Sequence, residues 1–222
     1  MYTSTMPKWI VTGASGSLAT ACISELLERN RSVLAFSRSE VYNLDEGVTF
    51  SQVTDYSNLE IPPADYEGIL VTQGFFHYEL FERTSKSNLE NLVVANFLSQ
   101  IQVVQSFLKV IDKNKKTNIV VIGSTNAFAS GMGTAVYGAT KAAMLAFVEG
   151  MNHELIDSNI RFSFASMGTM ANEMGFKVPN QDPTTLLQVD FIAREIVRTI
   201  TCESNSWQPV ITIRRRNLGT IR

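Results

Sequence analysis

Short apolar runs alternate with longer amphipathic stretches along this chain, and the alternation predicts strands separated by helices. Helical spacing occurs from Leu18 to Asn30 and over 89–111, 135–155 and 189–200. The expected strands are residues 8–13, 32–37, 48–53, 68–74, 117–123, 160–166 and 209–214. Strands that are apolar on both faces and alternate with helices are typical of a parallel sheet with right-handed crossovers. We therefore expect an α/β fold built on a doubly wound parallel sheet of about seven strands.

The spacing of these elements indicates one domain over residues 1–222, with no repeat or linker. The segment between the third and fourth strands is too short for a full crossover helix. Residues 168–188 have no clean period, and an irregular segment of this length is more often functional than accidental. We expect it to close over a substrate, and its apolar side chains indicate an apolar or mixed ligand. The basic run 214–217 reads as a solvated edge rather than a binding patch.

Composition narrows the classes of function. Apolar residues make up 45% of the 222 residues and charged residues 18%, which excludes a disordered chain. The net charge of −2 provides no global positive field for a nucleic acid. Cys22 and Cys202 are too few for a disulfide framework, and His77 and His153 lie too far apart to indicate a metal site. The chain also lacks an apolar run long enough for a membrane span, so we expect a cytoplasmic protein without metal, membrane or nucleic-acid partner.

A glycine-containing turn follows the first strand and leads directly into a helix. Such a turn directs backbone N–H groups and the positive end of the helix dipole at one point, which suits a pyrophosphate. Its glycines permit a tight turn and a close approach of the ligand to the backbone. The predicted contacts in this turn are Gly13, Ser15, Gly16, Ser17 and Leu18.

The end of the second strand bears on the choice of cofactor. A dinucleotide with a free ribose 2′-hydroxyl is normally held here by Asp or Glu, whereas this chain has Ser37 and Arg38. A hydroxyl and a guanidinium suit a 2′-phosphate instead. We therefore expect NADP(H) to be favoured over NAD(H).

Three residues predict acid–base chemistry near this turn. Tyr137 and Lys141 are four residues apart on one predicted helix and share a face. An ammonium beside a phenol favours the phenolate, so we expect Lys141 to lower the pKa of Tyr137 toward neutrality. Ser124 follows the strand 117–123 at the edge where open α/β sheets bind ligands, and its hydroxyl could hold a substrate oxygen.

With these motifs, nearly the whole chain resembles the short-chain dehydrogenase/reductases, which have a Rossmann-type fold that binds NAD(P). That family has a Tyr-x-x-x-Lys pair, a serine thirteen residues before the tyrosine, and an asparagine in the preceding long helix, here Asn96. The resemblance implies that Tyr137 is the acid/base, that Ser124 orients the substrate oxygen, and that Lys141 lowers the tyrosine pKa and binds the nicotinamide ribose. Asn96 would hold a water that relays protons to Lys141.

The resemblance implies further cofactor contacts, although several motifs differ from the common pattern. The glycine motif reads TGxxGxxA, which is closer to the extended and atypical branches. Other family positions are occupied by Gln52 and Val53 near the adenine, by Thr72, Gln73 and Gly74 after the fourth strand, and by Met167, Gly168 and Asn172 after the sixth. In family members the long helices pair between subunits, which implies a homodimer or homotetramer.

We consider an NADP(H)-dependent reaction that interconverts a small carbonyl compound and an alcohol to be the best interpretation. A sensor that binds a dinucleotide without turnover is the alternative, because the cofactor motifs are altered. A nucleotide-sugar epimerase or dehydratase is a third reading, although 222 residues leave little room for a sugar-binding domain. A hydrolase is excluded by the lack of a G-x-S-x-G motif.

Overall fold

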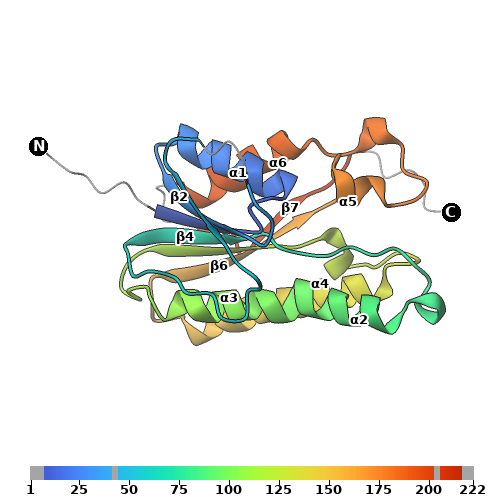
Figure 1. The fold of residues 1–222 in the computed structure, drawn as a ribbon, viewed down its shortest axis with the longest axis horizontal. Helices are drawn as coiled ribbons and strands as arrows, with labels where there is room; N and C mark the ends of the chain where they lie inside the picture. The colour runs from blue at the N-terminus through green and yellow to red at the C-terminus, as the bar shows by residue number, and fades with distance from the viewer. Residues whose placement is uncertain (1–7, 42–44, 203–205, 217–222) are drawn as a thin grey trace, which may run out of the picture.

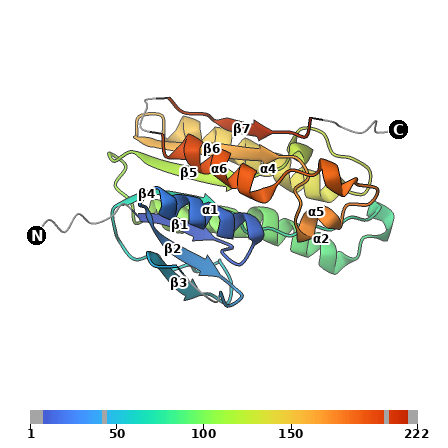
Figure 2. The same cartoon turned by 90° about the horizontal axis from the view of Figure 1, so that it is seen from above.

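The computed structural model describes residues 8–41, 45–202 and 206–216, and in it the predicted doubly wound sheet is confirmed (Figure 1). The described residues form one seven-stranded sheet of order β3-β2-β1-β4-β5-β6-β7, in which every neighbouring pair is parallel (Figure 2). The strands are β1 (Lys8–Thr12), β2 (Ser32–Ser37), β3 (Val48–Gln52), β4 (Tyr66–Val71), β5 (Thr117–Ile122), β6 (Ile160–Met167) and β7 (Val210–Ile213).

Helices cover both faces of this sheet. The helices are α1 (Ser17–Glu28), α2 (Lys86–Val93), α3 (Ser99–Leu108), α4 (Ala135–Glu154), α5 (Glu173–Phe176) and α6 (Val189–Ile200). Helices α1 and α6 lie side by side on one face, whereas α2, α3 and α4 cover the other (Figure 1).

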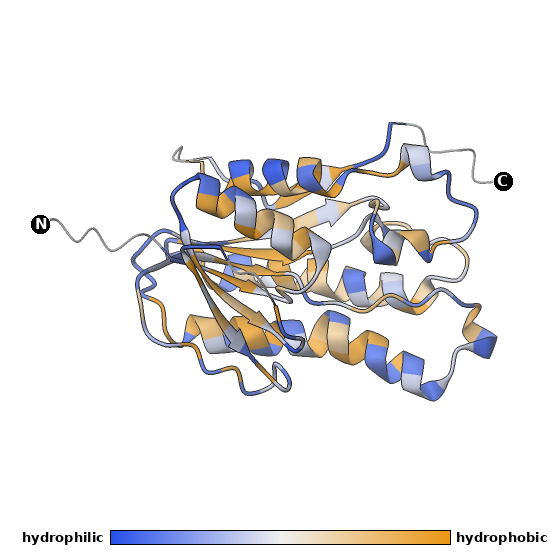
Figure 3. Ribbon diagram, turned by 45° about the horizontal axis from the view of Figure 1, so that its top comes forward, coloured by the Kyte–Doolittle hydropathy of each residue, from blue (hydrophilic) through white to orange (hydrophobic). Residues whose placement is uncertain are grey.

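Successive side chains along each strand point to opposite faces of the sheet, so the hydrophobic core is divided into two layers, one on each face. In β1, Val11 faces the α1/α6 layer and Ile10 faces the α3/α4 layer, and both are fully buried. Strands that bury both faces need apolar residues at almost every position, which is why the strand runs could be recognised from the sequence. Figure 3 shows this hydrophobic colouring along the sheet and on the inner sides of the helices that cover it.

The connection from β3 to β4 contains no helix, as its length predicted. Residues 53–65 instead cross the sheet as an irregular segment that buries Tyr56, Leu59 and Ile61 against the α3/α4 face. Three apolar side chains at irregular spacing thus take the place of a crossover helix. This substitution accounts for part of the small size of the domain.

The continuous helix expected over 89–111 is divided into three parts. Helices α2 and α3 are joined by a π-helical turn, Val94–Leu98, at whose centre lies the buried Asn96. Helical periodicity cannot predict such a turn, because the i, i+3 and i+4 pattern continues on both sides of it. Single π-turns inside helices occur frequently at functional sites.

The irregular segment 168–188 contains the short helix α5 and a 3₁₀ turn, Pro183–Thr185. Its two ends are joined, because Ala171 N donates to the Leu187 carbonyl at 2.8 Å and Leu187 N donates to the Thr169 carbonyl at 3.1 Å. The segment is therefore a loop that leaves the end of β6 and returns beside its own starting point.

Among the described residues, no helix combines the length and the apolar character needed to cross a membrane.

Candidate active site

The predicted site residues gather at the edge of the sheet where the parallel strands end. The order of the sheet reverses between β1 and β4, since β2 and β3 extend it to one side and β5, β6 and β7 to the other. In open α/β sheets, ligands bind outside the carboxyl ends of the strands at such a switch point. The turns after these strands therefore form the candidate active site.

Gly13, in the turn after β1, occupies a position that only glycine fits. Its φ is +69°, and a Cβ there would lie 2.8 Å from the backbone nitrogen of Gln73 and 2.9 Å from Thr72 Oγ1. Its amide donates to the hydroxyl of Tyr56 at 3.0 Å. The β1 turn is thereby packed directly against the turn after β4.

The N-terminus of α1 has the open amides that an anion requires. Gly16 caps the helix without a side-chain hydrogen bond, and the first turn of the helix carries no acidic residue. Ser15, Gly16 and Ser17 are exposed, while Leu18 is buried beneath the turn. Unpaired N–H groups and the positive helix end fit the pyrophosphate of a dinucleotide.

The ends of β2 and β3 place the residues predicted for the adenosine side together. Ser37 is buried and its hydroxyl donates to Ser15 Oγ at 2.9 Å, so it lies directly beside the glycine turn. Arg38 is exposed, and its carbonyl accepts a hydrogen bond from Gln52 Nε2 at 3.0 Å. Val53 N donates to the Ser37 carbonyl at 2.9 Å.

The turn after β4 contains an unsatisfied polar group. Thr72 Oγ1 donates to the Thr12 carbonyl, Thr12 Oγ1 donates to Gln73 Oε1, and Gln100 Nε2 donates to the Gln73 carbonyl at 2.6 Å. Within the described residues, the buried Gln73 Nε2 has no hydrogen-bond partner. A buried donor without a partner costs free energy, and a polar ligand seated on this turn would satisfy it. The turns after β1 and β4 therefore fit a bound dinucleotide.

Tyr137, Lys141 and Ser124 are brought together by α4 and the end of β5. Lys141 is buried, and its Nζ donates to the carbonyl of Ile122 at 2.9 Å and lies 5.8 Å from the centre of the Tyr137 ring. The Tyr137 ring packs edge-on against Phe76 with 5.0 Å between ring centres. Ser124 forms a hydrogen bond with Tyr137 that favours the phenolate.

The pKa of Tyr137 differs from the value expected from its lysine neighbour. Burial raises the pKa of the phenol to about 12, and the hydrogen bond with Ser124 offsets only part of this rise. Burial likewise lowers the pKa of Lys141 to about 8. Burial therefore sets the direction of the Tyr137 pKa shift in this structure, and the lowering of that pKa by Lys141 stays a prediction.

Asn96 is not part of the cavity wall described below, and its side chain forms hydrogen bonds with the backbone of Phe75. Its Oδ1 accepts from Phe75 N at 2.9 Å, and its Nδ2 donates to the Phe75 carbonyl at 2.7 Å. A Cβ on Gly74 would lie 2.9 Å from Asn96 Oδ1 and 3.9 Å from Lys141 Nζ, so the three residues are close neighbours. The relay water on Asn96 stays a prediction.

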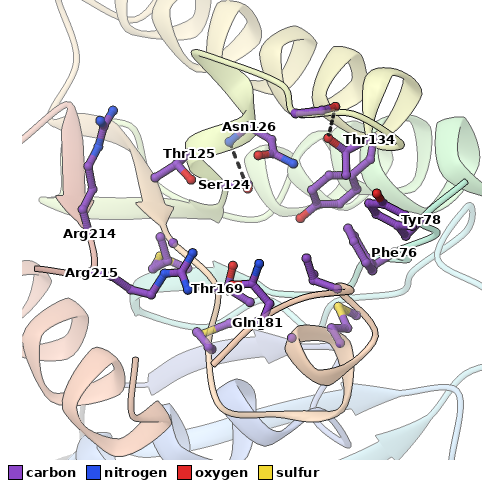
Figure 4. A pocket seen from close by; sticks show the side chains of 18 of the residues that line it. Phe76, Tyr78, Ser124, Thr125, Asn126, Thr134, Thr169, Gln181, Arg214 and Arg215 are labelled. Atoms are coloured by element: carbon purple, nitrogen blue, oxygen red, sulfur yellow. Dashed lines mark hydrogen bonds between the residues drawn. The ribbon is translucent and has the colours of Figure 1, made fainter. Parts of the chain in front are cut away.

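A cavity of about 450 Å³ opens in front of Tyr137 (Figure 4). Of the predicted site residues, Ser124, Tyr137, Met167, Gly168 and Asn172 line it. The glycine turn, the ends of β2 and β3, and residues 72–74 lie outside its wall. Asn172 links the two regions, because its Nδ2 donates to Ser17 Oγ at 3.3 Å while its Oδ1 accepts from Gly175 N.

Some residues of this site were missed or misread in the sequence. Arg214 and Arg215 line the cavity, although the basic run was expected to be a solvated edge. The signal was present in the run itself, but only the fold places the end of β7 beside the end of β6. Tyr56, whose hydroxyl binds Gly13, gave no signal, because it lies in an irregular segment.

Comparison with known proteins agrees with this architecture. The family model described as short chain dehydrogenase matches residues 69–183, slightly more than half of the chain. The chain belongs to the short-chain dehydrogenase family. Among curated relatives of this family, the uncharacterized oxidoreductase TDA5 of Saccharomyces cerevisiae is 24% identical over 213 residues. The match covers 85% of this chain and 64% of the length of that relative.

Solved structures of the family have the same fold at low identity. A short-chain dehydrogenase/reductase from Vibrio parahaemolyticus has a TM-score of 0.82 at 20% identity, covering 94% of this chain and all of that one. A 3-ketoacyl-(acyl-carrier-protein) reductase from Brucella melitensis, complexed with NADH, has a TM-score of 0.83 at 14% identity over 94% and 96% of the two chains. A short chain dehydrogenase from Burkholderia cenocepacia in complex with NADP gives 0.78 at 20% identity over 94% and 88%.

Proposed function

We propose that this short-chain dehydrogenase is an NADP(H)-dependent oxidoreductase that interconverts a carbonyl compound and an alcohol. The observation that carries the proposal is the position of Ser124 and Tyr137 on the wall of one cavity, with the buried ammonium of Lys141 behind them. A hydroxyl, a phenol and a buried cation at one point are the groups that proton transfer to a carbonyl oxygen requires.

The cofactor in this proposal is a nicotinamide dinucleotide, as in the Brucella and Burkholderia complexes named above. The turns after β1 and β4 would hold it, with Gly13, Gly16 and Ser17 at its pyrophosphate and Gln73 Nε2 as a donor. When bound, it supplies a hydride to the carbonyl carbon or accepts one from the alcohol. Ser37 and Arg38 support NADP(H) over NAD(H), because no carboxylate side chain ends β2 to bind a free 2′-hydroxyl.

The protein's own part in the reaction is to hold the substrate oxygen and to move its proton. Ser124 donates a hydrogen bond to the oxygen and positions it beside the phenol. Tyr137 is protonated at neutral pH, since its pKa is about 12, and it gives its proton to the oxygen during reduction. The Lys141 ammonium, held by the Ile122 carbonyl, stabilises the phenolate that remains.

Replacing Tyr137 by Phe tests this assignment. We expect kcat for carbonyl reduction to fall by at least about 100-fold, the scale of general acid catalysis, while NADPH affinity measured by fluorescence stays within about threefold because the cofactor turns are untouched. Tyr66→Phe is the control, since it removes a hydroxyl bound to the Pro62 carbonyl in the core. A Tyr137→Phe enzyme with unchanged kcat would contradict the role of the phenol.

The second candidate is a dinucleotide sensor without turnover. The raised pKa of Tyr137 favours it, because a phenol of this pKa is a poor base for oxidising an alcohol at neutral pH. Binding of NADPH without reduction of any carbonyl in a broad panel would support the sensor. Turnover that is lost in Tyr137→Phe would exclude it.

We also propose that the chain forms a homodimer or homotetramer through its long helices. Val94 and Leu98 are exposed on the outer side of the helix that contains Asn96, and Ala139 and Ala146 are exposed on α4. Exposed apolar residues at helical spacing on two neighbouring helices form a surface suited to a second copy.

A further inference from the structure

The cavity has a basic end that the reaction itself does not use. Arg214 and Arg215 directly follow β7 and line the cavity. The parallel pairing of β6 and β7 brings them there, because Gly168 N donates to the Ile213 carbonyl at 2.9 Å. The sheet thus fixes the backbone of both arginines at the edge of the site.

The arginines lie on one side of the reactive residues. In Figure 4, Arg214 and Arg215 occupy one side of the cavity, Phe76 and Tyr78 occupy the opposite side, and Ser124 lies between them. A substrate whose oxygen rests on Ser124 would therefore extend toward guanidinium groups at one end and toward aromatic rings at the other.

The positive charge of this end is uncompensated within the part of the chain that the structure describes. No Asp or Glu lines the cavity, and neither arginine takes part in a salt bridge. The acidic residues of the segment 168–188, which contributes to the cavity wall, have other partners, since Glu173 binds Lys177 at 2.7 Å and Asp182 accepts from Thr184. Two cations without anions in a cavity wall attract a ligand of negative charge.

The guanidinium of Arg215 is oriented and has free donors. It is half-buried, and Nη1 donates to Gln181 Oε1 at 2.6 Å and to Thr185 Oγ1 at 3.4 Å. Both of its hydrogen bonds come from Nη1, and Nε and Nη2 have no partner among the described residues, so these two donors can bind a carboxylate or phosphate in the two-pronged manner that arginine favours. Arg214 is exposed, and in Figure 4 its side chain extends away from that of Arg215, so Arg215 is the arginine whose guanidinium faces the cavity.

We propose that the substrate of this cavity carries an anionic group, a carboxylate or a phosphate, that Arg215 binds, with Arg214 adding to the positive field, while Ser124 holds the carbonyl oxygen. This inference rests on the proposed function for the carbonyl, but the arginines and their charge do not depend on it. The apolar or mixed ligand expected from the sequence is thereby revised to an oxo compound with one charged end.

Calorimetric titration of the full chain with two matched pairs of probes tests the inference without requiring turnover. One pair is 4-oxopentanoate and its methyl ester, and the other is dihydroxyacetone phosphate and dihydroxyacetone. We expect the charged member of at least one pair to bind about tenfold or more tightly than its neutral partner, the scale of a charge-assisted arginine contact. The pair that gives the preference identifies the anion as carboxylate or phosphate.

Substitutions then assign the preference to the arginines. Arg215→Gln should reduce the ratio of charged to neutral affinity by about fivefold or more, Arg214→Gln should reduce it less, and Arg215→Lys should retain part of it. Arg216→Gln is the matched control, because this substitution removes the same charge at the next residue, which is not part of the cavity wall. Its ratio should equal that of the unaltered protein.

Three results would overturn the inference. The first is equal binding of the charged and neutral probes, which includes no binding of any probe. The second is a loss of the charged-to-neutral affinity ratio in Arg216→Gln equal to that in the Arg215 variant. The third is a loss of NADPH affinity in the Arg215 variant as large as its loss of affinity for the charged probe. The last would assign the arginines to the cofactor. Charge-selective binding without reduction of either probe by NADPH would uphold the anion site and count against the proposed oxidoreductase.

Discussion

Lys141 is a buried lysine whose ammonium lies beside the ring of Tyr137. Its ammonium has one described partner, the Ile122 carbonyl, and burial lowers its pKa to about 8. A cation in this state destabilises the fold at neutral pH, yet it is placed where a phenolate would form. This cost in stability is what the acid–base role proposed for the site would require.

The pH dependence of stability should reveal this buried charge. Below pH 8 the folded and unfolded states both hold the proton on Lys141, so the full penalty applies. Between pH 8 and about 10.5 only the unfolded state holds it, and stability rises with pH. We expect the unfolding free energy of the cofactor-free protein, compared with Lys141→Met, to rise by about 3 kcal/mol from pH 7 to pH 10.5. Urea denaturation at each pH measures this, and a constant difference between the two proteins would contradict the shifted pKa.

For the individual site residues, the sequence was sufficient to predict which side chains lie near one another, but not to predict their pKa values. The four-residue spacing of Tyr137 and Lys141 predicted a shared helix face, and the position of Ser124 after a strand predicted its place at the sheet edge. The direction of the tyrosine pKa shift could not be predicted, because it depends on how completely Phe76 and the surrounding wall exclude water. Loss of hydration is a property of packing that no local spacing encodes.

The turn between β1 and α1 is the element to which we assign the pyrophosphate of the proposed cofactor. It joins a buried strand to a helix end without a capping side chain, and its backbone packs against the turn after β4. The positive φ of Gly13, and the 2.8 Å that would separate a Cβ there from Gln73 N, leave no room for a side chain. The sequence identified this turn because glycine and small residues were its local signature.

Gly13→Ala tests the turn. The left-handed conformation and the steric clash should lower the unfolding free energy by about 2–3 kcal/mol and weaken NADPH binding by at least about tenfold. Gly150→Ala is the control, since a Cβ there meets nothing within 4 Å and alanine favours the α4 helix. Urea titration and nicotinamide fluorescence provide the two readouts. A Gly13→Ala protein as stable as Gly150→Ala would contradict the packing.

Other elements could not be assigned from local pattern. The π-turn at Val94–Leu98 lies inside a helix whose apolar spacing is continuous, and it is accompanied by tertiary hydrogen bonds from Asn96 to the Phe75 backbone. The crossing segment 53–65 buries side chains without periodicity. Both features depend on contacts between residues distant in sequence, which periodicity does not record.

On the scale of the whole molecule, the parallel sheet converts seven separate strand ends into one edge. The fold class followed from alternating apolar runs, but the order of the strands, and with it the meeting of the β6 and β7 ends, did not. Arg214 and Arg215 therefore read as surface charge in the sequence, although the sheet places them on the cavity wall. Sites assembled from distant strand ends become visible only once the order of the strands is known.

Assembly of the molecule is tested by Val94→Glu. Val94 is 49% exposed, so a charge there should change the stability of the single chain by no more than about 0.5 kcal/mol. In a paired helix surface the same charge would be buried, so we expect light scattering to shift from a dimer or tetramer toward the monomer. Phe191→Glu, which changes an exposed apolar residue on α6 at the opposite face of the sheet, is the control. An unchanged molar mass in Val94→Glu would contradict pairing through this face.

The most direct test of the account is a fluorescence titration of the purified protein with NADPH and, separately, with NADH. The account predicts saturable binding of NADPH, about tenfold or more tighter than NADH, because Ser37 and Arg38 suit a 2′-phosphate. Failure of both nucleotides to bind would contradict the assignment of the β1 and β4 turns as a cofactor site, and with it the proposed oxidoreductase.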